Sequence, residues 1–273
     1  RVAKQPDLVP LLFDRSPNYV LGQVEDSINI QSGAVVIYFY AFGRRTPVLI
    51  DTLIPCQKYT TFPCFSHPDE TNMSPWFCLV EKAFAKLMGS YSNIIHFTPI
   101  ESIYHLFGFY PTLKYLRKLT KRGKSKKMSP LQRLLKYRDQ KAVMTVSINP
   151  QRLPETVSFE DVNRNKLNPG EEYLILDIKE ADDKHFISLR DPWKKHVWAG
   201  PYSRSSNLWT PELQEALGAN QEDESVFWMI EDDFFNYFTS LKIARPVSSN
   251  WHMKCSEFIM APGPYDGWDI EKQ

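Results

Sequence analysis

Two neighbouring β-type runs place the strongest constraint on what this chain can fold into. The segments EYLILDI (172–178) and HFISLRD (185–191) are rich in β-branched and aromatic residues. Only the acidic stretch KEADDK separates them, which is enough for a turn and too little for a crossover, so the two strands are predicted to pair antiparallel. Further strand-like runs at 142–148 and 225–230, and a closing segment at 240–246, predict an antiparallel sheet in the second half of the chain.

The first half is predicted to be richer in helix, and its clearest helix follows Ser74. Ser74 is a favourable N-cap, Pro75 fits the first helical position, and Gly89 is placed to end the helix in a left-handed cap. The apolar residues of this segment repeat at helical spacing and predict one core face, whereas Glu81 and Lys82 are predicted to point outward. The predicted core residues are Trp76, Leu79, Val80, Ala83 and Leu87.

A hairpin is predicted before this helix. Residues 34–42 (AVVIYFYAF) are apolar throughout, Gly43 and the two arginines after it mark a turn, and PVLID runs back. Because the first run is apolar on both faces, it is predicted to be deeply buried.

Residues 112–138 are predicted to be helical and basic, and residues 231–238 to form a short helix with acids at its positive end. Helices come early and strands late, which indicates an α+β fold with segregated layers rather than an alternating βαβ sheet. The sequence contains no internal repeat, glycine-rich phosphate loop or GxSxG elbow.

Composition excludes several classes of protein. The net charge of +1 gives the whole chain no strong attraction to nucleic acid or a membrane. The longest apolar run, 34–42, is far shorter than the ~20 residues that span a bilayer as a helix. The cysteines at 56, 64, 78 and 255 lack CxxC or Cys/His metal spacing, so reduced structural thiols are predicted, with a Cys56–Cys64 disulfide left open.

Several segments, in the right order, resemble the protease core of the calpains, papain-like cysteine peptidases regulated by calcium. They include the hairpin 33–55, the helix SPWFCLVEKAFAKLMGSY (74–91), GEEYLILDI (170–178), SLRDPWKKHVWAGPYS (188–203) and SVFWMIEDDFFNYFTSLKI (225–243). The resemblance implies a papain-like fold with a helical first subdomain and an antiparallel-sheet second subdomain. It places the end of the first subdomain at 1–70, the second at 71–246, and the start of a further domain or tail at 247–273.

The resemblance also implies a Cys-His-Asn triad, in which a thiolate attacks the peptide carbonyl and an oriented histidine transfers the proton. Glu171 stands in the histidine place and Asp191 in the asparagine place, next to Trp193. The nucleophilic cysteine is expected a few residues before Arg1. Aspartate can orient a histidine, but a carboxylate at 171 would raise the pKa of a nearby thiol and could not protonate a leaving amine.

The calcium loop implied by the family is altered as well. Lys195 and Arg204 stand where the resemblance implies carboxylates, and calcium takes oxygen ligands. We therefore predict no metal site and no cofactor, although the acids at 222–224 leave open a sensor that binds a cation there.

The run KYLRKLTKRGKSKK (114–127) holds eight lysines and arginines and no acid. It is predicted either to bind an acidic partner or to be an ordinary solvated segment. The candidate binding residues are Arg117, Lys118, Lys121, Arg122, Lys124, Lys126 and Lys127.

Together these features predict a proteolytically inactive calpain-like domain, a pseudoenzyme that binds proteins or serves as a scaffold. The expected partner is an acidic protein surface such as tubulin tails, not nucleic acid or a membrane. Resemblance to calpain-like proteins that lack the triad implies the cytoplasm, with the cytoskeleton or the axoneme of a cilium as the expected place. The alternative is a calcium-dependent cysteine endopeptidase.

Overall fold

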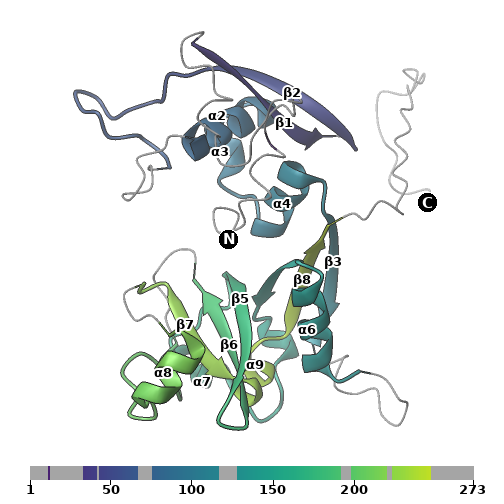
Figure 1. Ribbon diagram of the computed structural model, residues 1–273, viewed down its shortest axis with the longest axis vertical. Helices are drawn as coiled ribbons and strands as arrows, with labels where there is room; N and C mark the ends of the chain where they lie inside the picture. The colour runs from purple at the N-terminus through teal and green to yellow at the C-terminus, as the bar shows by residue number, and fades with distance from the viewer. Residues whose placement is uncertain are drawn as a thin grey trace, which may run out of the picture.

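The computed structural model describes residues 12, 33–41, 43–66, 76–116, 128–191, 198–219 and 223–246. Figure 1 shows the described elements in two groups, a β-hairpin with helices from the first half of the chain and a larger sheet with helices from the second half. The α+β arrangement with helices and an antiparallel sheet confirms the predicted fold class at this level.

The first group is built on the hairpin of β1 (Ala34–Ala41) and β2 (Arg44–Asp51). Helices α2 (Trp76–Met88), α3 (Tyr91–Ile94) and α4 (Pro99–Phe107) accompany it. The strand β1 buries alternate residues only, because a two-stranded sheet covered on one side leaves its other face partly exposed. The prediction of a strand buried on both faces was therefore wrong, although the hairpin itself is confirmed.

The helix α2 confirms the predicted core face, with Leu79, Val80 and Ala83 all buried. The prediction that Lys82 simply points outward was wrong. Its Nζ donates to the carbonyl of Leu53 and to Oδ1 of Asp51, both at 2.6 Å, and Lys86 Nζ donates to the carbonyl of Leu49 at 2.7 Å. The two lysines thus fasten the helix to β2 and the segment that follows it.

The second group is a six-stranded sheet with the order β3-β8-β4-β5-β6-β7, in which every pairing is antiparallel. The strands are β3 (Tyr110–Tyr115), β4 (Val143–Ser147), β5 (Glu172–Ala181), β6 (Lys184–Arg190), β7 (Val226–Ile230) and β8 (Ser240–Arg245). The turn between β5 and β6 places Asp182 and Asp183 at positive φ, so the predicted hairpin is confirmed.

The helices of the second group are α6 (Pro130–Asp139), α7 (Phe159–Arg164), α8 (Pro211–Leu217) and α9 (Glu231–Tyr237), with a 3₁₀ turn at Pro150–Arg152. One large hydrophobic cluster fills this group and includes Met144, Tyr173, Leu189 and Phe234. The hairpin and α2–α4 share a second cluster, which also takes in Val143 of β4 and Ala244 of β8. The two groups are therefore joined by apolar packing.

Residues 110–115 form a strand, so the prediction of helix from residue 112 was wrong at its beginning. Pairing with β8 along six residues outweighs helix propensity here. The clusters also group residues on both sides of position 70, and the subdomain division there stays a prediction. Residues 1–11, Ser74 and Pro75, Trp193, the cations of 117–127 and the tail 247–273 lie outside the described residues.

Candidate functional site

Glu171, which the sequence places by resemblance in the first of the two triad positions, lies in the turn that leads into β5. The side chain of Asn168 shapes this turn, because its Oδ1 accepts a hydrogen bond from the amide of Gly170 at 3.0 Å. The amide of Glu171 donates to the carbonyl of Asn168 at 3.2 Å. Glu171 is half-buried, so its backbone is fixed while part of its side chain reaches solvent.

The second position, Asp191, directly follows β6. Its amide donates to the carbonyl of Ser225 at 2.9 Å, which continues the pairing of β6 with β7. Asp191 is fully buried. The neighbouring tryptophan of the sequence motif, Trp193, is outside the described residues.

The carboxylates of Glu171 and Asp191 both affect the pKa of one phenol, that of Tyr173. Burial raises the pKa of Tyr173 above its usual value, a backbone hydrogen bond from Asn168 opposes this, and the charges of Asp191 and Glu171 raise it further. The phenol oxygen lies 2.8 Å from the donating amide of Asn168. The structure thus brings Glu171 and Asp191 to the same corner of the sheet, where both carboxylates add negative charge near Tyr173.

Two arginines pair with Asp223 and Glu224, acids of the cluster that the sequence left open as a cation sensor. Arg190 Nη2 lies 2.5 Å from Asp223 Oδ2, and Arg204 Nη1 lies 3.6 Å from Glu224 Oε1. Burial alone would raise the pKa of the Asp223 carboxyl, but hydrogen bonds from Ser225 and the charge of Arg190 outweigh it, so this pKa lies below its usual value. Asp223 and Glu224 therefore each have an arginine partner within the chain.

The turn at 198–202 is held by aromatic packing. Trp198 is buried and its Nε1 donates to the carbonyl of Pro201 at 2.6 Å. The ring lies so close to Gly200 that an added Cβ would come within 2.1 Å of it. Tyr202 takes a positive φ of 59° and its ring meets Trp209 edge-on, with centroids 5.8 Å apart.

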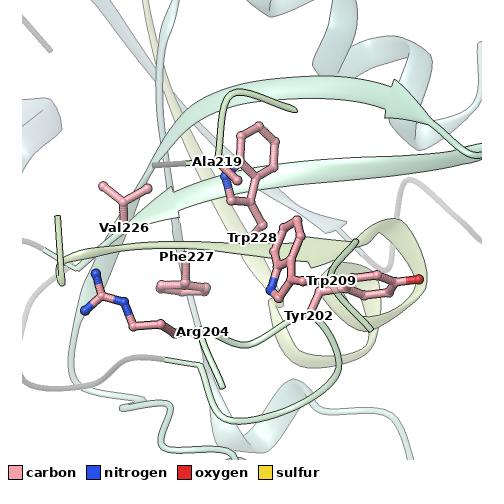
Figure 2. A pocket seen from close by; sticks show the side chains of 7 residues that line it. All are labelled: Tyr202, Arg204, Trp209, Ala219, Val226, Phe227 and Trp228. Carbon is pink, nitrogen blue, oxygen red and sulfur yellow. The ribbon is translucent and has the colours of Figure 1, made fainter. Parts of the chain in front are cut away.

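A small pocket opens beside this turn (Figure 2). Its cavity volume is about 20 Å³, which is room for about one water molecule. Most of its lining is aromatic, with two small aliphatic residues and one cation. The lining residues are Tyr202, Arg204, Trp209, Ala219, Val226, Phe227 and Trp228. Such a hollow is too small for a peptide side chain unless the surrounding rings move.

A polar cluster that the sequence analysis missed lies on the sheet next to Glu171. The side chain of Glu172 pairs with Lys242 of β8 and accepts a hydrogen bond from Thr145 Oγ1 of β4 at 3.0 Å. Thr145 is fully buried. The residues lie on three adjacent strands, so only the strand order β8-β4-β5 brings them together, and sequence spacing gave no signal for it.

Three histidines lie in the described residues, and each is engaged elsewhere or remote. His185 lies at the other end of β6 from Asp191, roughly 20 Å away at the rise of a β-strand. Its ring nitrogens lie 3.4 Å from Glu231 and 3.7 Å from Glu180. His105 contacts the carbonyl of Tyr40 at 3.0 Å through Nδ1, and His96 lies two residues after the end of the short helix α3.

Three cysteines lie in the described residues: Cys56, Cys64 and Cys78. Burial raises the pKa of Cys78, whereas a nucleophilic cysteine needs a lowered pKa. Cys56 and Cys64 are free and exposed. Cys56 pairs with Pro63 and the amide of Cys64 donates to Pro55, so the two thiols leave opposite faces of this short ladder, which disfavours the disulfide that the sequence left open.

Within the described residues, no group of three or more His, Cys, Asp or Glu side chains is arranged to hold a metal ion. The helices of the described ranges include none that is long and apolar enough to cross a bilayer.

The helical group and the six-stranded antiparallel sheet are together consistent with the core of a papain-like cysteine protease. The sequence profile of the family described as "Calpain family cysteine protease" matches residues 17–245. The chain therefore belongs to the calpain family, which confirms the resemblance drawn from its sequence.

Known relatives support this membership at low identity. The chain is 29% identical over 217 residues to the calpain-type cysteine protease DEK1 of Arabidopsis thaliana, covering 79% of this chain and 10% of that protein. It is 28% identical over 224 residues to the calpain-1 catalytic subunit of Macaca fascicularis, covering 80% of this chain and 29% of that protein. It is 24% identical over 232 residues to calpain-5 of Mus musculus, covering 78% of this chain and 35% of that protein. The chain thus spans from a tenth to about a third of the length of these relatives.

Proposed function

We propose that this chain is a proteolytically inactive calpain-family domain that binds other proteins. The proposal is carried by Glu171, which motif matching puts in the place of the family's histidine and which lies near Tyr173 together with the buried Asp191. A carboxylate there opposes thiolate formation and cannot donate a proton as imidazolium does. The alternative, a calcium-dependent cysteine endopeptidase, needs a proton carrier that the described histidines do not supply.

We propose that calcium does not regulate this domain. Arg190 pairs with Asp223 and Arg204 with Glu224, so guanidinium groups lie where a divalent cation would need free oxygens. The same pairs weigh against a cation sensor at this loop, because a bound ion would have to displace them.

The partner we propose is an acidic protein surface, such as the tails of tubulin in a cytoskeletal or axonemal assembly. The support is the sequence of 117–127, which carries the seven candidate cations and no acid. Attraction between exposed charges falls off beyond ~8 Å at physiological ionic strength, so the contact is expected to be sensitive to salt.

Co-sedimentation with microtubules tests the partner. Wild type is expected to pellet at low salt and much less at high salt. A variant with Lys118, Lys121, Arg122 and Lys124 changed to glutamate is expected to stay in the supernatant. A control with the exposed Lys136 and Lys166 changed to glutamate removes charge elsewhere and is expected to pellet nearly as wild type does. Equal pelleting of wild type and the quadruple variant, or no pelleting by either, would contradict this partner.

A further inference from the structure

The segment that follows β2 exposes large apolar side chains from an ordered loop. In the tip loop, residues 53–65, Tyr59 is 92% exposed, Leu53 76% and Phe62 66%. Exposed apolar residues are ordinary when scattered singly, but here three large ones fall within ten residues of one loop, a concentration that favours a contact surface. Figure 1 shows the blue loop after β2 reaching outward from the first group.

The tip loop is held in shape by its own backbone. Cys56 and Pro63 pair as an antiparallel bridge, and the amide of Gln57 donates to the carbonyl of Phe62 at 2.9 Å. The amide of Cys64 donates to the carbonyl of Pro55 at 2.9 Å. Tyr59 at the turn takes a positive φ of 63°. An ordered loop loses little conformational entropy on binding, which favours a functional contact.

The base of the loop is fastened to the helices behind it. Oε2 of Glu81 accepts hydrogen bonds from the amide and hydroxyl of Ser66 at 2.9 and 2.6 Å. The ring of Phe65 stacks on Tyr91 with a centroid distance of 3.8 Å. Glu81 was predicted to point outward, whereas in the structure its carboxylate holds Ser66 at the base of the loop. Leu53, Tyr59 and Phe62 are therefore presented on a rigid stem.

The charge of the loop is entirely positive. Residues 52–66 contain Lys58 and no acid. Lys58 Nζ lies 4.8 Å from the centre of the Tyr59 ring, so the cation and the aromatic side chain share the tip. The carboxylate before the loop, Asp51, is paired with Lys82 at 2.6 Å.

We propose that the tip loop inserts into the headgroup region of an anionic lipid bilayer. Three exposed side chains offer roughly 400 Å² of apolar surface, about half of the ~800 Å² that each partner contributes to a stable protein interface. An interfacial site needs only a few immersed side chains, aided by the attraction of a lysine to anionic lipid. Tyrosine is well suited to such an interface because one end of its side chain is apolar and the other is polar.

This inference rests on the tip loop alone and is independent of the proposed function. The sequence predicted no membrane partner from the overall charge and the lack of a spanning run. Neither the overall charge nor the lack of a membrane-spanning run excludes a loop that enters only the headgroup region of the bilayer.

Sedimentation of the full-length protein with vesicles tests the proposal. The vesicles are phosphatidylcholine alone or phosphatidylcholine mixed with phosphatidylserine. Wild type is expected to bind the mixed vesicles, and Tyr59→Ser with Phe62→Ser is expected to lower the partition coefficient at least about tenfold. Lys58→Glu is expected to weaken binding to mixed vesicles only. The matched control, Leu113→Ser with Leu208→Ser, removes exposed apolar side chains elsewhere and is expected to bind as wild type does.

Two further measurements separate this contact from others. The quadruple glutamate variant of the 118–124 cations removes any binding due to the basic segment, and the tip-loop contribution is expected to persist in it. Brominated lipid is expected to quench the tryptophan fluorescence of Tyr59→Trp more than that of wild type, whose seven tryptophans lie elsewhere in the chain. Thermal midpoints of all variants check that they fold.

The proposal is overturned if wild type fails to bind mixed vesicles, if the tip-loop variant binds equally, or if binding is lost only in the quadruple variant. It is also overturned if sedimentation velocity shows self-association that Tyr59→Ser with Phe62→Ser abolishes, because the loop would then dock on a second copy of the chain.

Discussion

Single atoms decide the conformation of the turn that follows β6. Gly200 lies under the ring of Trp198, which is itself fixed by its hydrogen bond to the carbonyl of Pro201. A methyl group at Gly200 would come within 2.1 Å of that ring, so the buried tryptophan or the backbone must shift. The adjacent Tyr202 and the small aromatic pocket depend on the same turn.

Gly200→Ala is therefore expected to lower the free energy of unfolding by about 1–3 kcal/mol, the usual cost of overpacking a core. Urea denaturation measures it. Gly170→Ala is the control, because the nearest atom to an added Cβ there is 3.5 Å away, and a change within about 0.5 kcal/mol is expected. Equal stability of the two variants would show that the turn can relax around the added methyl group.

At the scale of elements, α4 links the two groups of the fold. Its buried residues Ile100, Ile103 and Phe107 belong to the cluster that also includes Val143 and Ala244 of the sheet. A capping box begins the helix: the Thr98 hydroxyl accepts from the amide of Glu101 at 3.4 Å, and the Glu101 carboxylate accepts from the amide of Thr98 at 2.8 Å.

Thr98→Ala is expected to destabilise the protein by about 1 kcal/mol, because the amide of Glu101 loses the hydroxyl oxygen that accepts its hydrogen bond, whereas the amide of Thr98 keeps the Glu101 carboxylate. Thermal or urea unfolding measures the loss, and Thr61→Ala on the exposed tip loop removes the same atoms as a control. A loss no greater than that of the control would mean that packing, and not the cap, fixes the start of α4.

The elements that the sequence could predict are those with a strong local pattern. Helix α2, the hairpin of β1 and β2 and the strand pair β5–β6 were all recognisable, because apolar spacing and turn residues lie within one short segment. The strand β3 was missed, since its partner β8 lies more than a hundred residues away. The hydrogen bond from Lys82 to Leu53 and the Glu172–Lys242 ion pair were not predicted for the same reason, because only the tertiary fold brings these groups together.

Motif matching predicted Glu171 and Asp191 at the triad positions, and this assignment stays a prediction. The structure adds that both carboxylates lie near Tyr173, which the sequence did not predict. The ion pairs of Arg190 and Arg204 were not foreseeable, because they depend on how the ends of β6 and β7 meet.

The stability of the whole molecule is expected to be independent of calcium. Adding millimolar calcium is expected to leave the thermal midpoint unchanged, because a ligand raises stability only when it binds the folded state and the acids near β7 are already paired. Differential scanning calorimetry with calcium, with the same concentration of magnesium, and with a chelator measures this. A rise of several degrees with calcium alone would contradict the assignment of those acids to the arginines.

The central claim is that the protein belongs to the calpain family without cleaving peptide bonds. The most direct measurement is the digestion of casein and of a fluorogenic calpain peptide by the full-length protein in calcium, together with labelling by an epoxide inhibitor of cysteine peptidases. The account predicts neither turnover nor covalent label, and no activity in Glu171→His alone. Calcium-dependent turnover with stoichiometric labelling of a cysteine would contradict it.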